Sequence, residues 1–355
     1  MESTTQMEKP ANSFAEPAAR SYRGTRSGAR SAAPVFVLGC PRSGTTVLFH
    51  MLMSAGNFAI YRAESNVFSV LQPRFGSLRF ESNRRELLRY WLKSKLFRVT
   101  GLEAEPIRER LLRECHSAGD FLRIVMEETA RHQAVKRWTD STPDHLLYIP
   151  QIKREIPNAL IVHIIRDGRD VALSYAKQGW VYPLPWDRKE EVAVAGLFWE
   201  WIVGKGRAYG RKLGQDYYEL RYEDLVEKPH ETLRALGDFI GQDLDYDHIL
   251  RVGIGSVSEP NSSFVSGPGG GFQPVQRWTK QMTGEQLENF EGLVGKSLQE
   301  LGYPLSFSGK KSFRHTRFRH TYRAWFAVRH WLKSRTPLGR FSSIDRMGIE
   351  EDSAK

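Results

Sequence analysis

Two glycines, three hydroxyl side chains and one arginine lie close together in the segment Gly39-Cys-Pro-Arg-Ser-Gly-Thr-Thr46. The glycines allow a tight turn between an apolar strand and a helix, so backbone N–H groups and the helix N-terminus would face an anion. Thr45 and Thr46 add hydroxyl donors, and Arg42 adds a planar cation that can bridge two oxygens. A glycine-rich turn without a ligand would have the same glycines, but the strand-to-helix context favours an anion site.

The spacing of the two glycines matches that of the nucleoside-triphosphate P-loop, but the residue that follows them does not. The P-loop carries a lysine after its second glycine, which reaches the β- and γ-phosphates. Here Thr45 occupies that position, and the cation lies within the loop at Arg42. The substitution argues against triphosphate chemistry, and a P-loop-type kinase or NTPase stays as the first alternative.

A second anion position is predicted where another apolar run, residues 159–165, ends at Arg166. Ser174 follows eight residues later, about two helical turns into the next predicted helix. A guanidinium and a hydroxyl that converge there can hold a phosphate separate from the first. On its own, this segment is more typical of a surface network of paired arginine and aspartate side chains than of a phosphate site.

The two motifs together resemble those of the sulfotransferases that use 3′-phosphoadenosine-5′-phosphosulfate (PAPS), in the bacterial, tyrosylprotein and carbohydrate-type branch. Pro41-Arg-Ser-Gly-Thr-Thr46 looks like their 5′-phosphosulfate loop, and Arg166-Asp-Gly-Arg-Asp-Val-Ala-Leu-Ser174 is similar to their 3′-phosphate motif. The resemblance spans roughly residues 34–305 and implies that Arg166 and Ser174 hold the 3′-phosphate. It implies that the 5′ end of PAPS is bound by Arg42, Ser43, Gly44, Thr45 and Thr46.

Three further residues are implied as nucleotide contacts by the same resemblance. Tyr222, in Arg221-Tyr-Glu-Asp-Leu-Val226, would approach the nucleotide, and a core tyrosine is the alternative. Arg277, in Gln276-Arg-Trp278, would close over the 3′-phosphate, and a surface arginine packed on the tryptophan is the alternative. Ser263 is a further candidate in the glycine-rich loop before it.

Sulfuryl transfer requires a base for the proton of the acceptor, cations on the leaving phosphate, and precise positioning, but no metal. The resemblance implies Glu64 as the base, because Glu-type members of the family carry theirs after the loop helix. An exposed glutamate paired with Arg62 is the alternative. His145 is a second candidate acid or base, or a donor to the sulfate, and a structural histidine is the alternative for it.

The sequence departs from the family at two positions. Ser141 stands where many bacterial members have a lysine that assists the leaving group, so either Arg42 works alone or Lys136 or Arg137 reaches in. Val47 stands where the cytosolic aryl-type enzymes have a tryptophan that stacks on adenine. The valine points towards the carbohydrate, protein or bacterial groups.

Aromatic residues are concentrated in residues 179–201, directly after the predicted 3′-phosphate helix. The family often places acceptor-lining segments there, and aromatic platforms suit sugars, lipids and other small molecules with a hydroxyl or amine. For Phe198 and Trp199, filling of the core is the better interpretation.

Apolar runs and helical periodicity alternate along residues 34–308, which predicts one α/β domain. Strands are predicted at 33–38, 159–165 and 217–222. Helices are predicted at 43–55, 170–178, 229–240, 287–301 and, with breaks, across 84–132. Alternation of this kind predicts a central parallel sheet between two helical layers, a three-layer α/β/α arrangement that is P-loop-like.

The net charge of +11 is concentrated near the end of the chain, because residues 309–340 contain ten Lys or Arg and no Asp or Glu. Aromatic residues share one face of the helix predicted there: Phe318, Tyr322, Trp325, Phe326 and Trp331. A basic amphipathic helix suits an anionic membrane surface through residues 310–335, and a helix packed on the core is the alternative. An inactive membrane or polyanion adaptor is therefore the second alternative function.

The remaining segments carry simpler expectations. Residues 1–33 are predicted to be a disordered tail, and residues 341–355 an acidic tail. Two cysteines are too few for a disulfide framework, and no run of eighteen apolar residues occurs. A cytoplasmic protein, at most peripheral on a membrane, is expected. Because residues 34–308 are nearly neutral, nucleic acid is not an expected partner.

Overall fold

The computed structural model describes residues 30–259, 274–307, 313–343 and 345–348. The tail predicted to be disordered lies outside these ranges as far as residue 29. Most of the loop predicted at 258–273, with Ser263, lies outside them too, as do residues 349–355 of the predicted acidic tail.

The central sheet has four parallel strands in the described residues, in the order β2-β1-β3-β4. They are β1 (Val35–Leu38), β2 (Thr139–Asp140), β3 (Leu160–Ile165) and β4 (Tyr217–Arg221). β1 pairs with β3 from Val35 opposite Leu160 to Leu38 opposite His163, and β3 continues beyond β1 to Ile165. The predicted strands at 33–38, 159–165 and 217–222 are confirmed, whereas β2, of only two residues, was not predicted.

Helices follow the strands along the chain and form the outer layers. The layers near the sheet contain α2 (Thr45–Ser54), α9 (Gly168–Lys177), α10 (Glu191–Gly210), α11 (Tyr222–Glu227), α12 (Pro229–Ile240), α13 (Tyr246–Val252), α14 (Trp278–Gln281) and α15 (Gly284–Glu300). The segment between β1 and β3 contains η1 (Val67–Leu71), α3 (Gln72–Phe75), α4 (Glu81–Trp91), α5 (Lys95–Arg98), α6 (Ala104–Glu114), α7 (Ala118–His132), η2 (Pro143–Tyr148) and α8 (Ile149–Glu155). The predicted helices are therefore present, with ends that differ by a few residues.

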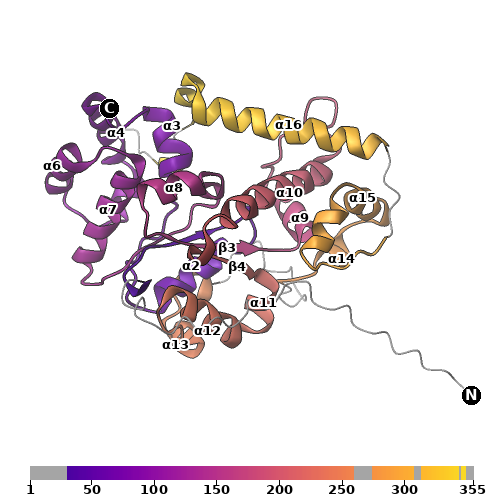
Figure 1. Cartoon of the computed structure of the whole chain (residues 1–355), viewed down its shortest axis with the longest axis horizontal. Coiled ribbons are helices and arrows are strands. Elements are labelled where there is room, and N and C mark those ends of the chain that lie inside the picture. The colour runs from indigo at the N-terminus through magenta and orange to yellow at the C-terminus, as the bar shows by residue number, and fades with distance from the viewer. Residues whose placement is uncertain (1–29, 260–273, 308–312, 344, 349–355) are drawn as a thin grey trace, which may run out of the picture.

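The sheet separates two hydrophobic cores, because side chains alternate between the faces of a strand. Phe36 and Leu38 of β1 belong to the larger core, with residues of α7, α9, α10 and α15. Val35 and Val37 belong to the other, with residues of α2, α12 and α13. Figure 1 shows the sheet between these helical layers. The three-layer α/β/α prediction is confirmed.

The buried helix α10 fixes the end of β3. Trp199 on α10 is fully buried and donates from Nε1 to the carbonyl oxygen of Arg166 at 3.1 Å. Its ring lies so close to Gly168 that a Cβ there would overlap it. Core filling is therefore the correct interpretation of Trp199, and its packing sets where α9 begins.

The long helix α16 (Phe313–Arg335) lies along α10 and α15 (Figure 1). The Tyr322 hydroxyl is buried, donates to Asp187 at 2.9 Å and accepts from the N–H of Leu184 at 2.9 Å. Arg319 forms two hydrogen bonds with the carboxylate of Glu200, at 2.6 and 2.8 Å. One face of α16 is thus docked on the domain.

The predicted single aromatic face of α16 is wrong in part. Phe318, Tyr322 and Phe326 pack against the larger core, whereas Trp325 and Trp331 are exposed. The aromatic residues therefore lie on two sides of the helix. No helix in the described part of the chain is both long and apolar enough to span a membrane.

Candidate active site

The loop between β1 and α2 leaves backbone donors free at the carboxyl edge of the sheet. Gly44, the N-cap of α2, has φ 93° and provides no side-chain cap. Arg42 is also left-handed, with φ 75°, and such strained residues cluster at ligand sites. Uncapped N–H groups at the start of a helix carry partial positive charge. This loop therefore has the geometry of an anion site.

Tyr222 packs directly under this loop. A Cβ at Gly44 would overlap the Tyr222 ring, so only glycine fits where the loop crosses it. The guanidinium of Arg166 lies 4.6 Å from the centre of the same ring. Tyr222 is buried, and it links the first predicted anion position to the second.

The side chains predicted to bind the two ends of the nucleotide contact each other. Arg42 Nε donates to Ser174 Oγ at 2.8 Å. Arg166 Nη1 donates to the carbonyl oxygen of Arg42 at 3.1 Å. Ser43 Oγ and Arg42 Nη2 are buried and have no hydrogen-bond partner within the described residues. These groups remain available to a ligand at the junction of the two loops.

Three arginines repel one another at this junction. Burial lowers the pKa of Arg42, and the charges of Arg166 and Arg277 lower it further. Burial and Arg166 likewise lower the pKa of Arg277. Like charges held together in a partly dry site are typical of functional sites, because an anion between them relieves the repulsion.

Asp170 brings Arg277 to this place. Its Oδ1 accepts from the backbone N–H of Trp278 at 3.0 Å, and its Oδ2 accepts from Arg166 Nη2 at 3.3 Å. Burial raises the pKa of Asp170, and the charge of Arg166 opposes that shift. A single carboxylate therefore joins the helix after β3 to the start of α14.

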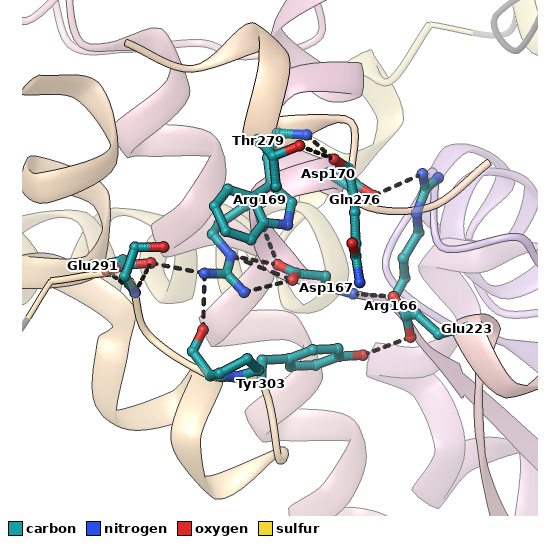
Figure 2. Close-up of polar contacts among 12 residues, drawn as sticks. Arg166, Asp167, Arg169, Asp170, Glu223, Gln276, Thr279, Glu291 and Tyr303 are labelled. Carbon is teal, nitrogen blue, oxygen red and sulfur yellow. Dashed lines mark hydrogen bonds and ion pairs between the residues drawn. The ribbon is translucent and has the colours of Figure 1, made fainter. Parts of the chain in front are cut away.

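A neighbouring network holds the same helices rigid. Arg169 lies between Asp167 and Glu291, with Nη atoms 2.7 Å from a carboxylate oxygen of each (Figure 2). Asp167 also caps α9 by accepting from the N–H of Arg169. The Tyr303 hydroxyl donates to Glu223 at 3.0 Å (Figure 2). These buried, mutually paired side chains are structural.

A cavity of about 760 Å³ opens beside the loop, at Pro41. Aromatic side chains form much of its wall: Tyr148, Tyr175, Trp180, Phe198, Trp201 and Phe326. Glu64 lines it as well, so the cavity contacts both the phosphate loop and a carboxylate. Its size and its mixed lining are those of a small-molecule site.

A sequence profile described as the sulfotransferase family matches residues 34–246, more than half of the chain. The chain belongs to the sulfotransferase family. The matched region contains both loops, Tyr222 and the cavity residues before α11. It ends before Arg277, which the fold brings back to the same site.

Two similar proteins match parts of this chain. The chain is 27% identical over 165 residues to flavonol 3-sulfotransferase of Flaveria bidentis, a match covering 42% of this chain and 52% of that protein. It is 28% identical over 224 residues to an uncharacterized protein of Aquifex aeolicus, covering 58% of this chain and 25% of that protein. The match thus spans about half the length of the first protein and a quarter of the length of the second.

Among solved structures, the sulfotransferase domain of the Synechococcus PCC 7002 olefin synthase is similar to this chain. The two are 16% identical, with a TM-score of 0.47, over 81% of this chain and 94% of that domain.

Both ring nitrogens of His145 are engaged within the fold. Its Nδ1 lies 3.0 Å from Asp140 Oδ2, and its Nε2 accepts from the N–H of Phe68 at 3.2 Å. The ring is fully buried and does not line the cavity. Both nitrogens are used, so the structural interpretation of His145 replaces the catalytic one.

Arg137 is bonded elsewhere in the fold. It lies before the amino end of β2, at the opposite edge of the sheet from the loop. Its guanidinium donates to the carbonyl oxygens of Ala33 at 2.6 Å and Ile240 at 3.0 Å. Of the two substitutes considered for the lysine absent at Ser141, Arg137 is therefore excluded, and exposed Lys136 precedes it at the same edge.

The sequence did not indicate that α16 forms part of the cavity wall. Phe326, Arg329, His330 and Lys333 line it. Arg329 lies over the ring of Tyr182 at 5.0 Å, and His330 lies 5.3 Å from Tyr148. The sequence shows that these residues lie three, four and seven positions after Phe326 and so share one face of a helix. It does not show which part of the protein that face covers.

Proposed function

We propose that this chain transfers a sulfuryl group from PAPS to a hydroxyl or amine of an acceptor bound in the aromatic cavity. The observation that carries the proposal is the convergence of Arg42, Arg166 and Arg277 on a loop with an uncapped helix N-terminus. Two phosphate-binding loops joined by the contact between Arg42 and Ser174 suit a donor with phosphates at both ends. Membership of the sulfotransferase family supports the same donor.

In this proposal the loop residues bind the 5′-phosphosulfate, with Ser43, Gly44, Thr45 and Thr46 donating to its oxygens. Arg166, Ser174 and Arg277 hold the 3′-phosphate, and Ser263, outside the described residues, stays a candidate there. Tyr222 supports both loops, since its ring packs against Gly44 and also lies beside the guanidinium of Arg166.

The reaction is an in-line displacement at sulfur. The acceptor oxygen forms a bond to sulfur while the bond from sulfur to the 5′-phosphate oxygen breaks. The electron pair leaves with that oxygen, where Arg42 neutralises the developing charge. The proton of the acceptor hydroxyl moves to the carboxylate of Glu64, which lines the cavity.

Nucleotide binding tests the proposal directly. 3′-Phosphoadenosine-5′-phosphate (PAP) at about one hundred times its Kd should add about 2.7 kcal/mol to the free energy of unfolding without Mg²⁺. That corresponds to an increase in Tm of roughly 3–6 °C. AMP, which lacks the 3′-phosphate, should shift the Tm less. Stabilisation by ATP with Mg²⁺ and not by PAP would establish the kinase alternative instead.

A membrane surface is proposed as a partner on the outer side of α16. Trp325, Val328 and Trp331 are 37%, 49% and 56% exposed there, and residues 313–341 contain no Asp or Glu. Exposed tryptophans among arginines suit an anionic lipid interface. The opposite side of the same helix lines the cavity, so a membrane-bound protein would hold its acceptor site near the lipid.

Vesicle binding tests this partner. Sedimentation with vesicles of phosphatidylcholine containing phosphatidylserine should pellet the protein, and vesicles of phosphatidylcholine alone should not. The double variant Trp325→Ser, Trp331→Ser should bind roughly tenfold more weakly, because it loses most of the inserted apolar area. Phe80→Ser, at an exposed aromatic residue distant in sequence, is the control. Equal binding by both variants would refute a docking role for α16.

A further inference from the structure

Two polar side chains in the cavity wall are buried without partners. Asn66 and Ser69 line the cavity and are only 3% and 1% exposed. Neither Asn66 Oδ1 nor Ser69 Oγ has a hydrogen-bond partner among the described residues. Buried polar atoms are nearly always paired in folded proteins, so two such atoms in one cavity wall indicate a ligand that pairs with them.

The orientation of the Asn66 amide is fixed by its other contacts. Its Nδ2 donates to the carbonyl oxygen of Glu64 at 3.0 Å, and a flipped amide would place two oxygens together. Its backbone N–H donates to Thr142 Oγ1 at 3.2 Å. The unpaired atom is therefore the oxygen Oδ1, which can only accept. Its partner must be an O–H or N–H group.

The backbone at Asn66 has an unusual conformation of a kind that recurs at functional sites. Asn66 is left-handed, with φ 54°, and begins the π-helix η1. Its carbonyl oxygen accepts from the N–H groups of both Val70 and Leu71, at 2.8 and 3.0 Å. A left-handed residue and a single π-helical turn are both unfavourable, and both recur next to ligands. Ser69 lies within this π-helical turn, and it lines the same cavity wall as Asn66.

We propose that Asn66 and Ser69 bind a second hydroxyl of the acceptor, beside the one that is sulfated, and that the acceptor is therefore a polyol such as a sugar. This inference rests on the proposed function. A hydroxyl has one proton, and the proton of the reacting hydroxyl goes to Glu64, so it cannot also satisfy Asn66 Oδ1. A neighbouring hydroxyl donates to Asn66 Oδ1 and accepts from Ser69 Oγ.

The aromatic wall suits the rest of such an acceptor. Tyr175 and Phe198 stack at 5.4 Å between ring centres, and Phe198 lies 6.0 Å from Trp201. Aromatic faces pack against the C–H surface of a sugar ring, while the hydroxyl groups at its edge reach the polar atoms. The cavity thus combines an apolar platform with a polar pair next to Glu64.

A matched pair of acceptors tests the assignment. Hexyl glucoside and 1-hexanol have the same alkyl chain, and only the first carries a second hydroxyl. The wild-type protein should have the higher kcat/KM for the glucoside. Ser69→Ala should lower that value about tenfold, mainly through KM, and change the value for 1-hexanol less than twofold.

Binding gives a readout that does not depend on turnover. Tryptophan fluorescence of the PAP-loaded protein should report tighter binding of the glucoside than of 1-hexanol, because Trp180 and Trp201 line the cavity. Ser65→Ala is the control, since Ser65 is buried in the same segment but does not line the cavity.

Three results would overturn the inference: no preference for the glucoside in either assay, an equal loss for both acceptors, or no loss in Ser69→Ala. The proposed function is tested separately by the shift in Tm with PAP. If PAP stabilises the protein and the glucoside is not preferred, the acceptor assignment alone is wrong.

Discussion

Arg42→Ala is expected to lower kcat for sulfuryl transfer by about a thousandfold, the upper part of the range for removing one transition-state donor. Arg42 bears more of this role than a single cation usually would, because Ser141 stands where the resemblance to the family implies a lysine, and Arg137 is bonded elsewhere. Its buried Nη2 has no partner within the described residues, so it is available to the leaving phosphate. Steady-state kinetics with labelled PAPS measure the loss.

The matched variants separate charge from geometry. Arg42→Lys keeps the charge but loses the planar fork, so kcat should recover only in part. Arg234→Ala, at an exposed arginine of α12, should leave kcat unchanged. The shift in Tm with PAP should fall in Arg42→Ala but persist through Arg166 and Arg277. If kcat of Arg42→Ala stays within tenfold of the wild-type value, Arg42 does not stabilise the transition state.

Much of the fold was predictable because the central strands are buried on both faces. β1 is a continuous apolar run, and β3 is interrupted only by His163. A buried glycine follows β1 and a buried arginine follows β3. β2 could not be found in this way, because its two residues, Thr139 and Asp140, are too few to show a hydrophobic pattern. α10 could not be predicted from hydrophobic periodicity, because it is buried on most sides. Its sequence therefore lacks the amphipathic stripe of a surface helix.

The candidate site was predictable where chemistry follows directly from a strand end, as at Arg42 and Arg166. The roles of residues that depend on tertiary contacts were harder to predict. The sequence around His145 does not reveal that Asp140 and the Phe68 N–H engage both ring nitrogens. Likewise, Arg277 reaches the site through the bond between Asp170 and the N–H of Trp278, over a hundred residues apart. Such pairings depend on the packing of α9 against α14.

Asp170 shows how the two phosphate positions are coupled. It holds Arg166 with one oxygen and the start of α14 with the other, while the charges of Arg42 and Arg166 disfavour an empty site. Attraction to Asp170 therefore offsets the repulsion between Arg166 and Arg277, which both lie close enough to lower the pKa of Arg42. The residues proposed to bind the donor are therefore in place before binding, which reduces the free energy spent on ordering them.

Glu64→Gln is expected to lower kcat by about a hundredfold to ten-thousandfold, the usual contribution of a positioned general base. Glutamine has nearly the same shape, but its amide cannot take the acceptor proton. The Asn66 amide still holds the main chain of residue 64 in this variant, because that bond is made to the carbonyl oxygen. Binding of PAP, measured by the shift in Tm, should therefore be unchanged while turnover is lost.

A second carboxylate in the cavity provides the comparison that decides the assignment. Asp144 also lines the cavity, so Asp144→Asn changes charge there without touching Glu64. If Glu64 is the base, kcat/KM of the wild type falls as the pH is lowered and the carboxylate becomes protonated. Asp144→Asn should keep that acidic limb, and the residual rate of Glu64→Gln should lack it. The opposite pattern would assign the proton to Asp144, and unchanged turnover in both variants would exclude a carboxylate base from this cavity.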